Sequence, residues 1–393
     1  MNKTAAEILG NPNYLAISYG GYREKTRDIQ PTIAQLKEDM KLLAAMGVKI
    51  LRDYNVQLQH APNLLEAIKQ LKDEDANFEM YVMLGAWIDC ENAWTDLEPN
   101  HDVESEQANA AEIQRAIALA NAYPDIVKII AVGNEAMIRW ATSYFVQPAV
   151  ILKWVNYLQE LKKSGELAAD LWITSSDDFA SWGGGDHSYR TPDLESLIKA
   201  VDYVSMHSYP MHNSHYNPQF WIVPAEEETL SEQEKIHAAI ERARQFLINQ
   251  YQEVSDYMKS LGVDKPLHIG ETGWASVSNG HYGPHGSRAS DEYKEGLYYQ
   301  YIREWTNQQK ISCFYFEAFD ECWKDQFNKK GSENHFGLIK LNGEAKYGLW
   351  DLVDNGAFDG LTRDGQVISK TYQGDKKALM EEVLVPPTHY HPG

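Results

Sequence analysis

Eight short apolar runs alternate with longer amphipathic segments along most of the chain, and this alternation constrains the fold more than any other feature. Each run has the length of a buried strand, and the segments between them have the apolar spacing of helices. Because a crossover helix returns the chain to the end of the sheet where the next strand begins, such an alternation predicts a parallel sheet. The runs are Tyr14–Tyr19, Val48–Tyr54, Phe78–Ala86, Ile126–Val132, Leu171–Ser175, Val201–His207, Leu267–Gly270 and Ile311–Phe316.

Residues typical of helix caps occur at the ends of the intervening helices. A glycine, which readily adopts a left-handed C-terminal cap, follows each of the segments Thr32–Met46, Pro148–Ser164 and Ser231–Leu261. Thr191 before Pro192, and Ser290 before Asp291 and Glu292, are typical of helix N-termini. The stretch after the eighth run is long and polar, so we expect the closing helix to be short or displaced.

Eight βα units predict an α/β fold in which one sheet closes into a (β/α)8 barrel. A chain of 393 residues, 43% of them hydrophobic, is long enough for one such domain with insertions. No repeat with a period of about 20 to 50 residues is present, which argues against a solenoid or a propeller. We predict a single domain over residues 1–393, with a barrel core at about 14–353 and a C-terminal extension at 354–393.

The charge balance excludes several classes of partner. Lys and Arg number 36 and Asp and Glu number 57, so the formal net charge is −21. A field of this sign repels phosphate backbones and anionic membrane surfaces. No run approaches the roughly 20 apolar residues of a membrane span, and the first ten residues lack the apolar core of a signal peptide. We expect no nucleic-acid partner and no membrane span.

Neither the cysteines nor the histidines have the spacing of a metal site. Cys90, Cys313 and Cys322 show no CxxC pattern, and the place of Cys313 in an apolar run predicts core packing. Four histidines lack helix-face ligand spacing and are interpreted as solvated loop residues. These are His187, His207, His212 and His215. We expect no metal and no cofactor.

Two glutamates follow apolar runs at the end of the barrel where active sites lie. The fourth run continues as Gly133-Asn134-Glu135, and the seventh continues as Glu271-Thr272-Gly273-Trp274. Because catalytic groups project from the C-terminal ends of barrel strands, the two carboxyl groups would face each other across the mouth. If they lie about 5–5.5 Å apart, one can protonate a glycosidic oxygen while the other attacks the anomeric carbon. Alternatively, both are only polar residues at strand ends, but their occurrence as a pair favours catalysis.

These motifs, in this order, resemble those of glycoside hydrolase family 17, the β-1,3-glucanases, which are retaining glycosidases of clan A. Ser18-Tyr19-Gly20 and Leu51-Arg52-Asp53-Tyr54-Asn55 are similar to the family's opening strands. FEAFDECWK at 316–324 and SENHFGL at 332–338 resemble its closing motifs. The resemblance extends from about residue 14 to 353. It implies that a laminarin-type β-1,3-glucan polysaccharide or oligosaccharide is hydrolysed by double displacement.

The resemblance also implies roles for individual residues. Glu135 would be the acid/base and Glu271 the nucleophile. Asn134 would hydrogen-bond the 2-hydroxyl of the sugar that is cleaved, and Tyr209 would steady the nucleophile. Six further positions are expected to bind substrate or to adjust the site: Arg52, Tyr54, Trp274, Glu321, Lys324 and Glu333.

Two interpretations of Glu321, Lys324 and Glu333 stay open. Their positions match a charged cluster beside the nucleophile, where a positive charge would keep Glu271 ionised. They would equally form a structural ion pair without a role in catalysis.

Aromatic residues just beyond the strand ends are candidates for stacking on sugar rings. We predict sugar contact for Trp274 and Tyr54, while Tyr22, Trp87 and Phe319 are candidates that core packing explains as well. The loops at 176–190 and 210–229 are long and rich in aromatic residues, which slightly favours a narrowed cleft with short products over an open groove. Ala275 replaces the proline that usually follows this motif in plant members, so the loop there need not have the same shape.

Other functions remain open on the sequence alone. The same carboxyl groups would support transglucosylation if a sugar hydroxyl outcompeted water. Related barrels cleave mannans or β-1,4-glucans, and a catalytically silent barrel would be a glucan-binding protein. A polysaccharide substrate implies a secreted, periplasmic or surface-attached protein.

Overall fold

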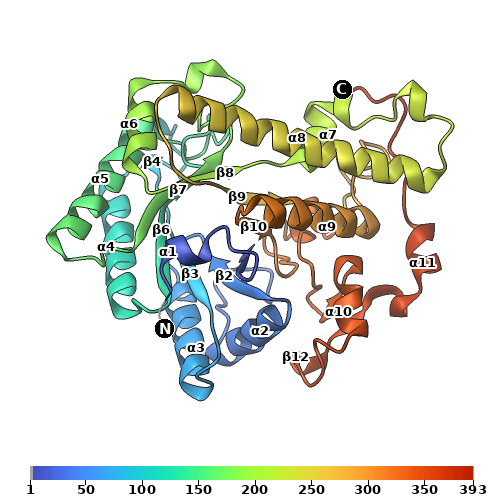
Figure 1. Cartoon of the computed structure of the whole chain (residues 1–393), viewed down its shortest axis with the longest axis horizontal. Helices are drawn as coiled ribbons and strands as arrows, with labels where there is room; N and C mark the ends of the chain where they lie inside the picture. The colour runs from blue at the N-terminus through green and yellow to red at the C-terminus, as the bar shows by residue number, and fades with distance from the viewer. Residues whose placement is uncertain (1–2, 393) are drawn as a thin grey trace.

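Eight parallel strands form a closed barrel in the computed structural model, which describes residues 3–392 (Figure 1). The strands follow one another around the barrel in chain order, and the last pairs with the first. They are β1 (Leu15–Ser18), β2 (Val48–Arg52), β3 (Tyr81–Ala86), β6 (Val127–Asn134), β7 (Trp172–Asp178), β8 (Val204–His207), β9 (Leu267–Gly273) and β10 (Cys313–Phe316). Each overlaps one of the predicted runs, although β6, β7 and β9 continue two or three residues further, and the predicted (β/α)8 fold is confirmed.

Long helices connect the strands and surround the barrel (Figure 1). They are α2 (Ile33–Ala45), α3 (His60–Glu74), α4 (Glu106–Ala122), α5 (Pro148–Ser164), α6 (Pro192–Ala200), α8 (Glu232–Ser260) and α9 (Glu292–Gln309). The predicted C-terminal glycines Gly47, Gly165 and Gly262 all have positive φ. The side chains of Thr191 and Asp291 accept hydrogen bonds from the backbone at the starts of α6 and α9. The glycine caps and the Thr191 cap are therefore confirmed, whereas the cap of α9 is Asp291 and not Ser290.

Shorter elements lie at the two ends of the barrel and after β10. Before and between the barrel strands these are α1 (Ala5–Ile8), β4 (Cys90–Glu91), β5 (Asn100–Glu104), η1 (His187–Tyr189), α7 (Pro210–Tyr216), η2 (Pro218–Phe220) and η3 (Ala225–Glu227). After β10 come η4 (Ser332–Asn334), β11 (Glu344–Ala345), η5 (Tyr347–Leu349), α10 (Trp350–Asp354), β12 (Thr362–Arg363), β13 (Gln366–Val367), β14 (Ser369–Lys370), η6 (Thr371–Gly374) and α11 (Lys376–Glu381). The closing helix α10 is short, as predicted.

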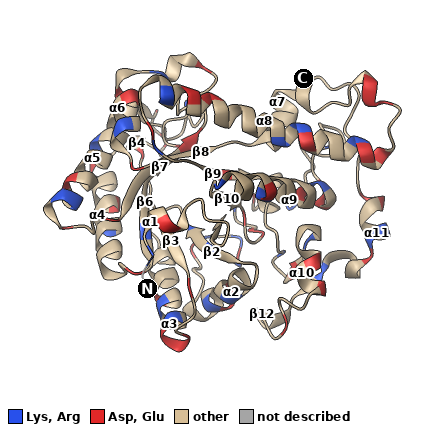
Figure 2. Ribbon diagram, in the orientation of Figure 1, with Lys and Arg blue, Asp and Glu red and all other residues tan. Residues whose placement is uncertain are grey.

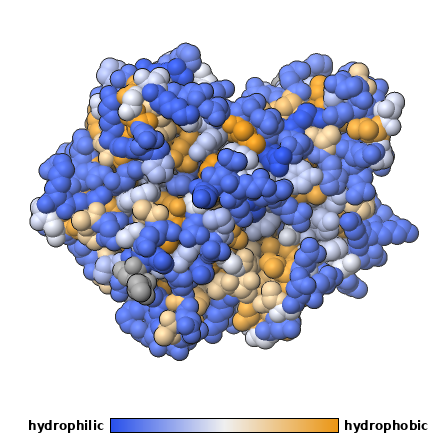
Figure 3. All heavy atoms as spheres, in the orientation of Figure 1, coloured by the Kyte–Doolittle hydropathy of each residue, from blue (hydrophilic) through white to orange (hydrophobic). Residues whose placement is uncertain are grey.

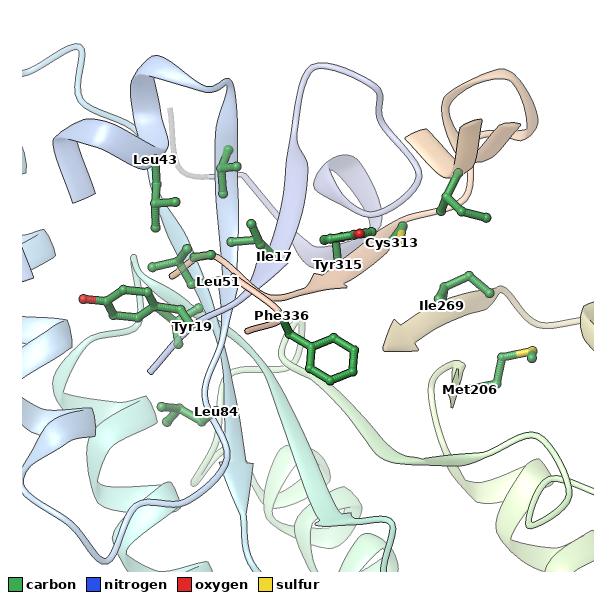
Figure 4. Packing of buried hydrophobic residues seen from close by; sticks show 14 of the residues in the cluster. Ile17, Tyr19, Leu43, Leu51, Leu84, Met206, Ile269, Cys313, Tyr315 and Phe336 are labelled. Atoms are coloured by element: carbon green, nitrogen blue, oxygen red, sulfur yellow. The ribbon is translucent and has the colours of Figure 1, made fainter. Parts of the chain in front are cut away.

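The two faces of the barrel strands pack into different cores. Ala16 joins a cluster inside the barrel that includes Ile8 of α1, whereas Ile17 joins the larger cluster between strands and helices. Successive residues of a strand point to opposite faces, which produces this division. Figure 4 shows part of the larger cluster, with Ile17, Leu51 and Ile269 gathered from three strands. Cys313 is buried in it, as predicted.

The C-terminal extension is tied to the barrel by buried polar contacts. Arg363 Nε lies 3.1 Å from Asp39 Oδ1 of α2, and both side chains are fully buried. At the far end of the extension, the hydroxyl of Tyr390 lies 2.6 Å from Nδ1 of His215. The extension therefore packs against both the first helix of the barrel and the loops after β8.

The surface agrees with the acidic composition. Asp, Glu, Lys and Arg lie mainly on the outer helices and loops (Figure 2), and the face drawn in Figure 3 is mostly hydrophilic. Among residues 3–392, none of the helices combines the length and the apolar character that a membrane crossing requires.

Candidate active site

The backbone at the end of β6 turns Glu135 into the mouth of the barrel. Glu135 has a φ of 46°, a left-handed conformation that non-glycine residues rarely adopt. Its backbone N–H donates to Ser176 of β7 over 2.9 Å, which holds the turn in place. Strained conformations of this kind persist where the surroundings enforce them, often at functional sites.

Glu271 approaches Glu135 from β9 on the other side of the mouth. One carboxylate oxygen of each glutamate and one ring nitrogen of His207 all lie within 4.8 Å of one another. This separation is close to the about 5–5.5 Å between the carboxyl groups of retaining glycosidases, and well below the about 6.5–9.5 Å of inverting ones. The two predicted catalytic residues are thus together, in a spacing suited to attack by one carboxylate.

Arg52 lies beneath the two glutamates and is only 1% exposed. Its Nη1 donates to Glu271 Oε1 over 2.6 Å, and its Nη2 donates to Asn134 Oδ1 over 2.6 Å. The prediction that Arg52 binds substrate is wrong, because its guanidinium has no free surface. It positions Glu271 and Asn134 instead.

His207 connects the two glutamates, a role the sequence analysis missed. Its side chain is completely buried at the end of β8, so the interpretation as a solvated loop residue is wrong. Nδ1 lies 3.0 Å from Glu135 Oε1, and Nε2 lies 3.2 Å from Arg52 Nη1. Since a guanidinium only donates, we assign the proton to Nδ1, which donates to Glu135. Of the other three histidines, only His187 is exposed.

The surroundings push the pKa values of the two glutamates in opposite directions. Burial, then the negative charge of Glu271, raises the pKa of Glu135 well above its ordinary value. Burial would raise the pKa of Glu271 as well, but His207, Arg52 and the Tyr209 hydroxyl outweigh it and lower that pKa. Burial lowers the pKa of His207 to about 4, so at pH 7 the charge that favours ionised Glu271 comes from Arg52. At neutral pH these opposite shifts favour a protonated Glu135 beside an ionised Glu271.

Arg52→Met is expected to move the acidic limb of the pH profile of kcat/KM upward. If Glu271 is the nucleophile, it must be ionised to attack, and activity should be lost as the pH falls through its pKa. Removing an adjacent guanidinium raises a carboxyl pKa by about one unit or more, and the loss should then begin at higher pH. Arg52→Lys retains a positive charge and should shift the limb less. An acidic limb that stays in place in Arg52→Met would contradict this role.

Three further predicted residues, Tyr54, Asn134 and Tyr209, lie next to Glu271 or Arg52. The Tyr209 hydroxyl donates to Glu271 Oε2 over 2.7 Å, and the Arg52 guanidinium lies 4.6 Å from the centre of the Tyr54 ring. Asn134 Oδ1 is taken by Arg52, which turns the amide so that its Nδ2 can donate elsewhere. Tyr54, Asn134 and Tyr209 are each only partly buried, so a ligand can reach them.

Trp274 is not available to substrate. It is fully buried, its Nε1 donates to the carbonyl of Ala289 over 2.9 Å, and its ring packs on Trp221 and Tyr298. The prediction of sugar contact is therefore wrong. The candidates Tyr22 and Phe319 are also core residues, 4% and 1% exposed.

Lys324 lies among the carboxylates of Glu317, Glu321 and Glu333, whose charges raise its pKa against the opposing effect of burial. Lys324 Nζ lies 2.5 Å from Glu317 Oε1 and 3.4 Å from Glu321 Oε2. Glu333 is largely exposed and faces His212 at 3.9 Å. Arg52 makes the ion pair with Glu271, so the structure favours the interpretation of Lys324 as part of a structural ion pair. Its partner in that ion pair is Glu317, which sequence reasoning did not select.

The long loops after β7 and β8 turn their largest aromatic residues inward. Trp182 and Trp221 are both completely buried, and their indole nitrogens donate to backbone carbonyl groups. Tyr216, by contrast, is 64% exposed. The bulk of these loops therefore supports the barrel, and the argument for a narrowed cleft from Trp182 and Trp221 does not hold.

An eight-stranded barrel with two facing carboxyl groups at its mouth is the arrangement of a glycosidase. Residues 16–337 match the BtgE/BtgC glycoside hydrolase domain, and the chain belongs to this family.

The chain is similar to proteins named for β-1,3-glucan cleavage. It is 64% identical to an endo-laminarinase from Formosa Hel1_33_131, whose crystal structure superimposes with a TM-score of 0.98 over 99% of both chains. It is 23% identical over 334 residues to a putative glucan endo-1,3-beta-glucosidase, btgC, from Aspergillus niger, covering 83% of this chain and 39% of that protein. A glucan 1,3-beta-glucosidase from Arthroderma benhamiae is 24% identical over 274 residues, covering 68% of this chain and 70% of that protein. The chain thus spans about two fifths of the Aspergillus protein.

Proposed function

We propose that this protein is a retaining endo-β-1,3-glucanase of glycoside hydrolase family 17 that hydrolyses laminarin-type glucan. The observation that carries the proposal is the pair of carboxyl groups at the ends of β6 and β9, whose closest atoms lie within 4.8 Å and whose pKa values move apart. A protonated acid and an ionised nucleophile at this spacing are what double displacement needs.

In the first step, the ionised Glu271 attacks the anomeric carbon of the bound glucose unit. The bond to the glycosidic oxygen breaks as protonated Glu135 gives its proton to that oxygen, and the reducing-end part of the chain leaves. His207 holds Glu135 in place through Nδ1. The product of this step is a glycosyl ester on Glu271, with Glu135 now ionised.

In the second step, Glu135 acts as a base. It removes a proton from a water molecule, which attacks the same carbon and releases Glu271 as a carboxylate. Arg52 and the Tyr209 hydroxyl stabilise the charge that returns to Glu271. Two inversions leave the β-configuration unchanged, and both carboxyl groups return to their starting protonation states.

We assign contacts with the sugar in the cleavage site to Asn134, whose amide would donate to the 2-hydroxyl, and to Tyr54. Lys324 and Glu333, which keep some exposure, remain proposed substrate contacts. The reaction so drawn uses only side chains of this chain and needs neither a metal nor a cofactor.

Internal cleavage is the proposed mode of attack. The endo designation belongs to the Formosa and Aspergillus relatives, and their similarity supports it for this chain. The inward packing of Trp182 and Trp221 supports it as well, because it leaves less bulk to close one end of the groove. We further propose that residues 1–393 are one catalytic domain that acts outside the cytoplasm, where polymeric glucan occurs.

The test is incubation with laminarin, curdlan, lichenan, carboxymethyl-cellulose and mannan, followed by measurement of reducing ends. Release from laminarin, with a ladder of intermediate oligosaccharides at early times, is expected. Activity on mannan or cellulose but not on laminarin would overturn the substrate class. Glucose or a single short product from the first minutes would overturn internal cleavage. In a parallel incubation with laminarihexaose, products longer than the hexaose would indicate transglucosylation.

A further inference from the structure

An exposed tryptophan is held rigidly on the hairpin that follows β3. Trp94 lies between β4 and β5, has a φ of 60°, and is 61% exposed. A bulky residue in the left-handed region is a marked outlier, and an exposed indole of this size is poorly matched to water. Both features occur in one residue, which calls for an explanation other than packing.

A hydrogen bond and a ring contact fix the orientation of the Trp94 ring. Its Nε1 donates to Asp89 Oδ1 over 3.1 Å, and Trp87 Nε1 donates to the same oxygen over 2.6 Å. One face of Trp94 is stacked on Tyr144, with ring centres 5.1 Å apart and planes tilted by 21°. With one face on Tyr144 and more than half of the residue exposed, the other face is open to solvent.

Asp89 is itself anchored and retains a free oxygen. Its backbone N–H donates to Asn109 Oδ1 of α4 over 2.9 Å, and its carbonyl accepts from Asn109 Nδ2 over 3.0 Å. Its Oδ1 accepts both indole hydrogen bonds, whereas its Oδ2 accepts no hydrogen bond from any of residues 3–392. An acceptor next to an open aromatic face is the combination that fixes a pyranose ring, which has apolar faces and hydroxyl edges.

Trp94, Tyr144 and Asp89 lie next to the side of the active site that carries Glu135. Tyr144, on which Trp94 rests, belongs to the loop that follows Glu135, and its hydroxyl lies 3.5 Å from the carbonyl oxygen of Asn134. β9 and Glu271 lie on the other side of the mouth. Because Glu135 protonates the departing oxygen, the part of the glucan that leaves must extend along the Glu135 side.

We propose that Trp94, stacked on Tyr144 and bonded to Asp89, forms a subsite for a glucose unit of the leaving-group part of the glucan. This inference rests on the proposed function. The open face of Trp94 stacks on the pyranose ring, and Asp89 Oδ2 accepts a hydrogen bond from one of its hydroxyl groups. The subsite lies away from the bond that is cleaved, so it contributes to binding rather than to the chemical step.

The test compares Trp94→Ala with wild-type protein on laminarin and on an aryl β-laminaritrioside. Loss of a contact made equally in ground and transition states raises KM and leaves kcat unchanged. We expect an increase of about tenfold in KM for laminarin, which corresponds to about 1.4 kcal/mol. The aryl substrate has no glucose unit beyond the cleaved bond, so its kinetics should not change.

Two control variants separate stacking from damage to the hairpin. Trp94→Phe keeps an aromatic face and should restore most of the affinity for laminarin. Leu97→Ala removes a 65% exposed apolar side chain from the same hairpin and should behave as wild type. An unchanged KM for laminarin in Trp94→Ala, or an equal loss on both substrates, would overturn the subsite.

Failure of the proposed function would be recognised separately. If the wild-type protein produced no new reducing ends from laminarin, hydrolysis would be refuted. Calorimetric measurement of laminarihexaose binding would then test the subsite. Binding by the wild type that weakens about tenfold in Trp94→Ala would support the subsite on a glucan-binding protein. Equal binding by both would overturn it.

Discussion

Glu271→Gln is expected to lower kcat on laminarin by at least about 10³-fold, a rise in the barrier of about 4 kcal/mol. The amide has nearly the shape of the carboxylate, but it cannot form the glycosyl ester. The amide oxygen can still accept from Arg52, and the Tyr209 hydroxyl, which donates to the other oxygen of Glu271, can accept from the amide nitrogen instead. We therefore expect the variant to fold and to bind glucan.

The matched control is Glu381→Gln, the same chemical change at an exposed position of α11. It should have wild-type kcat. Circular dichroism and binding of laminarihexaose would show that Glu271→Gln is folded and retains its groove. A kcat above about a tenth of the wild-type value, a loss of less than about 1.4 kcal/mol, would remove Glu271 from the nucleophile role.

Glu135→Ala is expected to slow laminarin hydrolysis by about 10²–10⁴-fold, the usual contribution of a general acid or base. An aryl glucoside with a good leaving group does not need the proton, so its first step should be affected far less. Azide should then rescue turnover by attacking the glycosyl ester in place of activated water. Equal losses on both substrates, with no effect of azide, would refute the acid/base assignment.

The pH profile gives an independent measure of the same role. Wild-type activity on laminarin should decline as the pH rises through the pKa of Glu135, which burial and Glu271 hold above its ordinary value. In Glu135→Ala, with the aryl substrate, this alkaline limb should disappear while the acidic limb stays. Retention of the alkaline limb would assign it to another group.

The barrel was predictable because its signals are local. Each buried strand is a short apolar run and each helix has its own periodicity and caps, so strand β9 and helix α5 are evident without tertiary information. The pairing of β10 with β1 follows from the count of eight units. The positions of Glu135 and Glu271 followed from the same rule, because they stand where strands end.

The errors have physical causes of two kinds. Trp274 is three residues from Glu271, so the alternation of a strand directs the two side chains to opposite faces, and that alternation was available in the sequence. His207 ends a predicted strand, so the reasoning that selected Glu135 also applied to it. The pairing of Lys324 with Glu317, and of Arg52 with Glu271, depends on distances in the folded structure, which sequence spacing does not contain.

Proton NMR of a laminarihexaose digest tests the central claim most directly. Spectra recorded from the first minutes should show the new reducing end in the β-configuration, with the α-anomer appearing only later through mutarotation. That result requires two displacements at the anomeric carbon, and therefore carboxyl groups close enough for direct attack. An α-anomer formed first, or no cleavage of the hexaose, would contradict the account of Glu135 and Glu271 given above.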